Sequence, residues 1–342
     1  MASPERRRLQ RIGFVHITPL DPADPRRGLT EAIDLFVLAE SLGLDSGWLR
    51  TRHLQHGLGS PAVLFGALSQ RTSRIDLGTA VVPLEHENPL RLAEDLAVAD
   101  LLAAGRLQIG LSVHPPRFSD EVNDQVFGAG WREQDYSYGR IERLRSLLAG
   151  DPVREPAAYG GIGGDIDSRR VEPHAPGLAD RLWYGAGSVR SAQWAGAAGL
   201  NLLVSNISSA EEGITDFDAA QRNQIDRFRA AHPLGERARV GQAHVLVPTD
   251  GATADQRERF ERYVAARTPR TRAVQGRNTL IAPDLSGTTD QIVARLLADP
   301  AFAAADEFLV ELPFELGPAD WTHILTQLAT EIAPRLGWEP QR

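Results

Sequence analysis

The sequence predicts an α/β fold, a (β/α)8 barrel, from two observations. Eight short runs rich in β-branched or other apolar residues each precede a longer segment with the apolar spacing of an amphipathic helix. Strands that alternate with helices pair in parallel through right-handed crossovers, and a closed barrel needs eight such units. An open, doubly wound sheet is the alternative arrangement. We expect a single domain over residues 1–342, with residues 1–10 as a flexible N-terminus.

The first part of the chain contains four of the predicted strands. Its helices have recognisable ends, because Ser60-Pro61 and Asn88-Pro89 each join a preferred N-cap residue to proline at the first helical position. Gly43 is typical of the position just after a helix. The predicted strands are 12–18, 45–50, 75–83 and 106–113, and the helices that follow the first three are 29–42, 61–71 and 89–103.

The second part of the chain continues the alternation. The predicted strands are 181–184, 200–205, 240–247 and 307–312, and the helices are 138–150, 188–198, 209–231, 252–267, 287–298 and 318–336. Two segments, 114–137 and 268–286, do not fit the repeat. Segments of this length are usually functional or disordered, so we interpret both as insertions at the C-terminal face of the barrel, either lids or solvated linkers.

The composition excludes several kinds of chemistry. The chain has no cysteine and no lysine, so all 37 basic positions are arginine. Disulfides, thiolate nucleophiles, Fe–S clusters and lysine Schiff bases are therefore excluded. The net charge of -8 argues against nucleic acid as a partner. We find no apolar segment of membrane-spanning length and no signal peptide, so we expect a cytoplasmic protein without a membrane partner.

Functional side chains of a (β/α)8 barrel lie at the carboxyl ends of its strands. Three histidines, His16, His53 and His114, stand at or just past the ends of predicted strands. The other polar residues at these ends are Thr18, Arg50, Thr51, Arg52, Glu85, His86, Ser112, Asn206, Glu311 and Glu315. The pair His53 and His56 lacks a third ligand nearby, as does the pair His86-Glu87, so we predict no metal site.

A glycine-rich turn joins the fifth predicted strand to a helix. It consists of Gly185, Ala186, Gly187, Ser188 and Val189. Free N–H groups at the start of the helix, together with the Ser188 hydroxyl, would form an anion site suited to a terminal phosphate. The alternative is an ordinary turn in which Ser188 is only the helix N-cap. The spacing differs from G-x-G-x-x-G, which makes a Rossmann fingerprint a weak interpretation.

Two further motifs are Arg-Thr-Ser-Arg-Ile-Asp-Leu-Gly-Thr-Ala-Val at 71–81 and Gly-Arg-Leu-Gln-Ile-Gly at 105–110. These motifs resemble the bacterial luciferase-like monooxygenase family of flavin-dependent (β/α)8 barrels and are quite specific to it. Further similar stretches are 60–64, 88–95, 185–188, 287–289 and 330–338. The resemblance extends over residues 11–338, almost the whole chain.

This resemblance implies an enzyme that binds reduced FMN at the C-terminal mouth of the barrel. A separate flavin reductase would supply the reduced FMN, which with O2 oxygenates a small organic substrate. The flavin phosphate is expected at 185–189 and the ring near Val82 and Ser112. An F420-dependent hydride-transfer oxidoreductase and a non-catalytic flavin-binding paralogue are the alternatives. Family analogy also implies a homodimer.

The sequence departs from the family at the ends of the second and fourth strands. Many members have Glu-His-His where this chain reads Thr51-Arg52-His53. His53, Arg52 and His114 are expected to surround the reactive edge of the flavin as catalytic residues. Arginine cannot act as a base at neutral pH, but it can stabilise an anionic reduced flavin. His114 would supply the polar group that many members provide through an arginine or asparagine.

Overall fold

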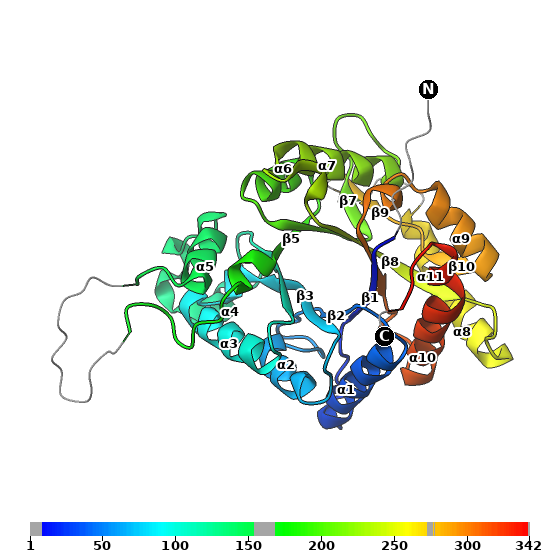
Figure 1. Cartoon of the computed structure of the whole chain (residues 1–342), viewed down its shortest axis with the longest axis horizontal. Helices are drawn as coiled ribbons and strands as arrows, with labels where there is room; N and C mark the ends of the chain where they lie inside the picture. The colour runs from blue at the N-terminus through cyan, green and yellow to red at the C-terminus, as the bar shows by residue number, and fades with distance from the viewer. Residues whose placement is uncertain (1–8, 154–167, 272–275, 277, 341–342) are drawn as a thin grey trace.

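The computed structural model describes residues 9–153, 168–271, 276 and 278–340, and it forms the predicted closed barrel (Figure 1). All eight predicted strands are present, and they pair in parallel in the cyclic order β1, β2, β3, β4, β5, β6, β8, β11. These strands are β1 (Arg11–His16), β2 (Ser46–Leu49), β3 (Asp76–Pro83), β4 (Leu107–Ser112), β5 (Leu182–Ala186), β6 (Asn201–Val204), β8 (Val240–Pro248) and β11 (Glu307–Glu311). Residues 1–8 of the predicted flexible N-terminus lie outside the described residues.

The helices lie outside the ring of strands (Figure 1). They are α1 (Pro25–Ser41), α2 (Pro61–Ser69), α3 (Pro89–Leu102), α4 (Asp120–Phe127), α5 (Gly139–Ala149), α6 (Val189–Ala197), α7 (Phe217–Ala231), α8 (Ala254–Arg267), α9 (Thr289–Ala298), α10 (Pro318–Gln327) and α11 (Ala333–Arg335). The Asn88 side chain caps α3 by accepting hydrogen bonds from the N–H groups of Leu90 and Arg91. Ser60 is the N-cap residue of α2 but makes no side-chain capping bond.

Two predicted helices differ strongly from the observed ones, whereas the bounds of the others differ by at most four residues at either end. The segment predicted as helix 209–231 becomes helical only at Phe217, where the Asp216 side chain caps α7. Before it lies β7 (Ile207–Ser209), which pairs antiparallel with β9 (Thr279–Ile281) outside the barrel. The predicted helix 318–336 is interrupted by a π-helical turn, Leu328–Ile332. Apolar periodicity marks the buried face of a helix, but it does not mark such starts and interruptions.

The two predicted insertions contain structure of their own. Segment 114–137 contains α4 and a short 3-10 helix, Ala129–Glu133. In segment 268–286, β9 pairs with β7, and β10 (Leu285–Gly287) pairs in parallel with the end of β8. These pairings hold the described part of the segment against the barrel. A solvated linker would make no such pairings, so the described part of this segment is not one. Residues 272–275 and 277 lie outside the described residues.

Large side chains fill the inside of the barrel. Trp48 and Trp183 pack edge to face, with ring centroids 5.4 Å apart, in a cluster with Val15, Leu203 and Leu309. Room for Trp48 exists because the neighbouring strand has glycine at Gly78, where a Cβ would overlap the indole ring. At the amino end, the Trp48 Nε1 atom donates to Ser46 Oγ (2.8 Å), which in turn donates to the buried Glu307 carboxylate. Among the described residues, these hydrogen-bonded side chains fill the amino end of the barrel.

Replacing Gly78 by alanine is expected to lower the free energy of unfolding by about 1–3 kcal/mol, because the new methyl group forces Trp48 from its packed position. Denaturant unfolding followed by circular dichroism measures the change. The control is Gly130→Ala, since nothing lies within 4 Å of a Cβ built there and the stability is expected to change by less than about 0.5 kcal/mol. Equal effects of the two substitutions would contradict the packing argument.

Candidate functional site

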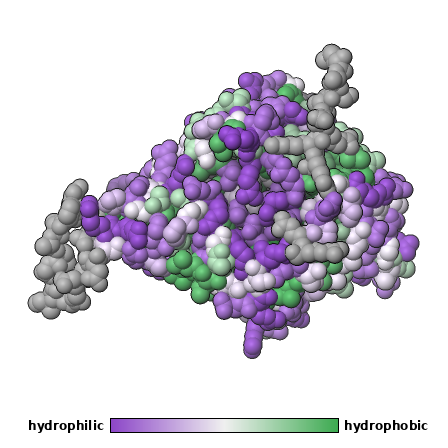
Figure 2. Space-filling view, in the orientation of Figure 1, coloured by the Kyte–Doolittle hydropathy of each residue, from purple (hydrophilic) through white to green (hydrophobic). Residues whose placement is uncertain are grey.

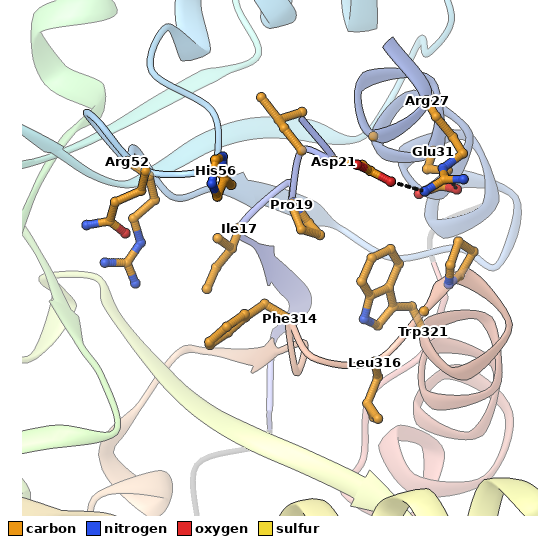
Figure 3. A pocket seen from close by; sticks show the side chains of 15 residues that line it. Ile17, Pro19, Asp21, Arg27, Glu31, Arg52, His56, Phe314, Leu316 and Trp321 are labelled. Atoms are coloured by element: carbon orange, nitrogen blue, oxygen red, sulfur yellow. Dashed lines mark hydrogen bonds and ion pairs between the residues drawn. The ribbon is translucent and has the colours of Figure 1, made fainter. Parts of the chain in front are cut away.

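Three neighbouring cavities open at the carboxyl ends of the strands. The outer cavity has a volume of about 850 Å3 (Figure 3), the middle cavity about 190 Å3 and the mouth cavity, at the barrel mouth, about 240 Å3. The outer and middle cavities share the side chains of Ile17, Arg52 and Phe314. The middle and mouth cavities share Arg50, Ile207 and Glu311. The candidate site therefore consists of three adjoining cavities rather than one central cavity.

A bulge in β3 shapes the mouth cavity. The register between β3 and β4 shifts between Thr79 and Val82, so the intervening Ala80 and Val81 line the cavity. Glycine on β5 leaves room for this bulge, because a Cβ at Gly185 would lie 2.9 Å from Val81 Cγ1. Val82, predicted to lie against the cofactor, is instead fully buried in the core between strands and helices. Val81 takes its place in the lining, because successive side chains of a strand face opposite sides.

One ion pair stands among these apolar walls. Arg50 follows β2 and Glu311 ends β11, and Arg50 Nη1 lies 3.7 Å from Glu311 Oε2. Among the described residues, they are the only charged ones that line the mouth cavity, and Glu311 is only 7% exposed. Both residues stand out in the sequence as strand-end polar residues. They lie close together because β1 pairs with β2 on one side and with β11 on the other. The sequence alone does not show this pairing of the first and last strands.

The predicted catalytic residue Arg52 does not line the mouth cavity. Its side chain borders the outer and middle cavities instead. Burial and the nearby Arg50 guanidinium lower the pKa of Arg52. The Glu311 carboxylate raises this pKa and so offsets part of the decrease. Among the described residues, no carboxylate forms an ion pair with its guanidinium. Arg52 is therefore a half-buried cation whose charge is incompletely compensated.

His114, the second predicted catalytic residue, is held by two acceptors. Its Nε2 lies 2.7 Å from Glu85 Oε1, and its Nδ1 lies 2.9 Å from the Pro115 carbonyl oxygen. Only the imidazolium form can donate to both acceptors at once. The hydrogen bond to Glu85 accordingly raises the pKa of His114. In this state His114 supplies a fixed positive charge and cannot accept a proton as a base.

His53, the third predicted catalytic residue, lies beside His86 and Glu87. The rings of His53 and His86 meet edge to face with centroids 5.4 Å apart, and His53 Nε2 lies 4.0 Å from Glu87 Oε1. Burial lowers the pKa of His53, so the neutral imidazole is favoured. Burial and the nearby Asp95 carboxylate raise the pKa of Glu87 to about 7. A neutral histidine and a carboxyl group that titrates near neutral pH can hold or pass a proton.

His53, Glu85, His86, Glu87 and His114 form one polar cluster at the ends of β2, β3 and β4. Within the described residues, no group of three or more His, Asp or Glu side chains has an arrangement that could hold a metal ion. Ser112, predicted beside the cofactor, ends β4 and is half-buried, but it does not line any of the three cavities.

In the described residues, no helix has the length and apolar character needed to cross a membrane.

The predicted anion site at the start of α6 holds a carboxylate of the chain itself. Ser188 and Ser191 form a capping box, each side-chain oxygen accepting the other residue's N–H at 3.2 Å. The next N–H group, that of Val189, donates to Glu211 Oε2 at 2.6 Å. Gly187 faces open space and lines the mouth cavity. The turn is thus both a helix cap and a cradle that accepts an anionic group.

The sequence model of one family, described as luciferase-like monooxygenase, matches residues 11–312. A protein named luciferase-like monooxygenase from Escherichia coli (strain K12) is 29% identical over 197 residues, which cover 55% of this chain and 53% of that protein. An F420-dependent glucose-6-phosphate dehydrogenase from Microbacterium testaceum (strain StLB037) is 30% identical over 143 residues, or 39% of this chain and 41% of that protein. The alignment thus spans about half the length of these relatives.

A solved structure with the same fold is the oxygenating constituent of 3,6-diketocamphane monooxygenase from Pseudomonas putida, in complex with FMN. The TM-score is 0.67 and the sequence identity is 17%. The superposition covers 97% of this chain and all of the other chain. At this identity the likeness establishes the fold alone.

Replacing Glu85 by glutamine is expected to lower the pKa of His114 toward 6.5, because a neutral amide stabilises the imidazolium less than a carboxylate does. The raised pKa means that the ion pair stabilises the protein fully below about pH 6.5, and less as the pH rises through the folded-state value. Glu85→Gln should therefore cost about 1 kcal/mol more stability at pH 6 than at pH 9. NMR titration of the histidine ring protons and unfolding at both pH values measure these effects.

The control is Glu87→Gln, because Glu87 is not among the groups that shift the pKa of His114. An unchanged His114 pKa in the Glu85→Gln variant, or an equal shift in both variants, would show that the Glu85 contact does not set it.

Proposed function

The chain belongs to the luciferase-like monooxygenase family, and we propose that it is a flavin-dependent monooxygenase that uses reduced FMN and O2 to oxygenate a small organic substrate. When bound, the reduced flavin supplies the two electrons with which one oxygen atom enters the substrate and the other leaves as water. The mouth cavity carries this proposal: it combines an apolar wall at Ala80–Val81, a glycine-lined side at Gly185–Gly187 and one ion pair.

The residues of this cavity suit a flavin. The apolar bulge of Ala80 and Val81 would support the flat ring, and the lack of a side chain at Gly187, which faces open space, would let the ring approach the backbone. The cradle at Ser188–Val189 would hold the phosphate, since it already accepts the carboxylate of Glu211. A phosphate at this position has to displace that carboxylate.

The protein's part in the reaction is to place charge and exclude water. Arg50 would stabilise negative charge that develops beside it, and Glu311 would keep the guanidinium in position. The apolar walls would keep water from the reacting atoms. His53 and Glu87 would hold or pass a proton at the ends of β2 and β3, while His114 would contribute a fixed charge. Arg52 would act from the substrate side rather than from the flavin side.

An F420-dependent oxidoreductase is the second candidate, favoured by the relative that is named for that cofactor. The cofactor that the protein binds distinguishes the two functions. Anaerobic titration of the protein with reduced FMN and with reduced F420, followed by absorbance and protein fluorescence, is expected to give micromolar binding of reduced FMN only. Arg50→Gln is expected to weaken the binding of anionic reduced FMN about tenfold, and that of oxidised FMN much less.

The control for Arg50→Gln is Arg26→Gln, which removes one exposed charge on α1 and should change neither affinity. Binding of reduced F420 alone would replace the first candidate by the second. Binding of neither cofactor would overturn both. If reduced FMN binds but neither peroxide nor any oxygenated product forms with O2, the chain is a non-catalytic flavin-binding protein.

Replacing Glu211 by glutamine is expected to tighten the binding of FMN about fivefold to tenfold, because the ligand phosphate no longer competes with a carboxylate for the Val189 N–H. Riboflavin, which has no phosphate, should bind with nearly unchanged affinity. The matched control is Glu212→Gln, since this neighbouring carboxylate bonds with Asn223 and Arg227 instead. An equal gain for riboflavin would place the phosphate elsewhere. Isothermal titration calorimetry gives all six affinities, for FMN and riboflavin with the wild type and the two variants.

We further propose a homodimer that receives reduced FMN from a separate reductase. An exposed apolar patch on the outer face of α2 and α3 supports the dimer (Figure 2), because soluble monomers rarely expose such patches. The patch consists of Val63, Val98, Leu101 and Leu102, which are 46–76% exposed. Leu101→Asp is expected to halve the mass measured by light scattering after size-exclusion chromatography. Leu234→Asp, at an equally exposed leucine elsewhere, should leave the mass unchanged.

A further inference from the structure

The outer cavity is the largest of the described cavities, and the flavin site does not account for it. It lies beside the barrel mouth, between the segment after β1, the segment after β2 and the segment that joins β11 to α10 (Figure 3). Its volume of about 850 Å3 falls within the range of small-molecule sites. Its connection to the mouth cavity runs along the middle cavity, with which it shares Arg52.

Apolar side chains form one wall of this cavity. Its lining includes Ile17, Phe314, Leu316 and Trp321, and the Trp321 indole is fixed by donating to the Pro313 carbonyl oxygen at 2.8 Å. Phe314 remains 48% exposed although it is a large aromatic side chain. A ligand with an apolar body would cover this ring and gain the free energy of removing it from water.

The charged side chains of the cavity are unequally compensated. On one side, Arg27 pairs with Asp21 at 3.1 Å and lies 3.7 Å from Glu31, so two carboxylates already neutralise it. On the other side, Figure 3 shows Arg52 beside Ile17 and Phe314. Within the described part of the chain, its half-buried guanidinium has no carboxylate in ion-pair contact. An added anion would be attracted to Arg52, whereas near Arg27 it would meet two like charges.

We propose that the outer cavity binds an apolar carboxylate, with the carboxylate on Arg52 and the apolar body against Ile17, Phe314 and Trp321. A guanidinium group can hold a carboxylate through two parallel hydrogen bonds, which gives both affinity and orientation. In so far as this ligand is the substrate, the inference rests on the proposed monooxygenase function. Binding to the cavity itself does not require flavin, so the two proposals can be tested separately.

The test uses 2-naphthoate and its uncharged isostere 2-naphthamide, titrated by calorimetry into the full-length protein without flavin. The wild type is expected to bind the carboxylate at least tenfold more tightly than the amide, with a preference that decreases at higher salt concentration. Arg52→Gln should abolish the preference, and Arg52→Lys should retain part of it because the charge remains but the double hydrogen bond is lost. Arg27→Gln, the matched arginine of the same cavity, should keep a severalfold preference.

Equal affinities for carboxylate and amide in the wild type, or an unchanged preference in Arg52→Gln, would overturn the proposal. Loss of the preference in Arg27→Gln but not in Arg52→Gln would overturn it as well. Phe314→Ala provides a second variant: it should weaken both ligands about equally and leave their ratio unchanged, and an unchanged affinity for both would contradict the assigned apolar wall.

Reduced FMN, titrated into the same preparations, separates this inference from the proposed function. If naphthoate binds as expected and reduced FMN does not bind, the cavity assignment stands and the monooxygenase proposal fails. If reduced FMN binds and naphthoate does not, only the cavity assignment fails.

Discussion

The packing of two tryptophans inside a ring of parallel strands is the constraint on which this structure depends. Trp48 and Trp183 fill the barrel edge to face. Gly78 on the neighbouring strand leaves the space that Trp48 takes, and the lack of a Cβ at Gly241 leaves room for Leu203 beside Trp183. Backbone hydrogen bonds set the spacing between neighbouring strands, and the close packing of these large and small residues fills the space inside the ring. Together they place the strand ends at which the candidate site lies.

The same packing explains why the open space lies at one end only. At the amino end, the buried Glu307 carboxylate accepts from Ser46 and lies close to Arg11 and Arg239, so polar groups close the barrel there. At the carboxyl end, the bulge of β3 leaves an apolar, glycine-lined space with one ion pair. The barrel therefore separates a part that provides stability from a part that can bind ligands, as is general for this architecture.

Apart from the histidines, arginine provides every basic side chain among the described residues of the candidate site, and the chain's own acids pair with several of these arginines. Glu311 compensates Arg50 in the mouth cavity, and Glu211 occupies the positive end of α6 where the sequence predicts a phosphate. These carboxylates indicate the places where the fold favours negative charge. Arg52 differs because no carboxylate of the described residues pairs with it, which leaves its charge available to a ligand. Because the chain has no lysine, these cations are planar guanidinium groups, which can bind a carboxylate or a phosphate through two hydrogen bonds.

The sequence by itself determined the eight strand–helix units, their order and the residues at the strand ends, because hydrophobic period, caps and turns are local properties. It could not determine that Val81 rather than Val82 lines the mouth cavity, since a one-residue bulge reverses which side chain faces inward. Nor could it pair His114 with Glu85, or Val189 with Glu211, because these contacts join separate elements. Only closure of the barrel brings such elements together, so the tertiary structure decided which strand-end residues form the site.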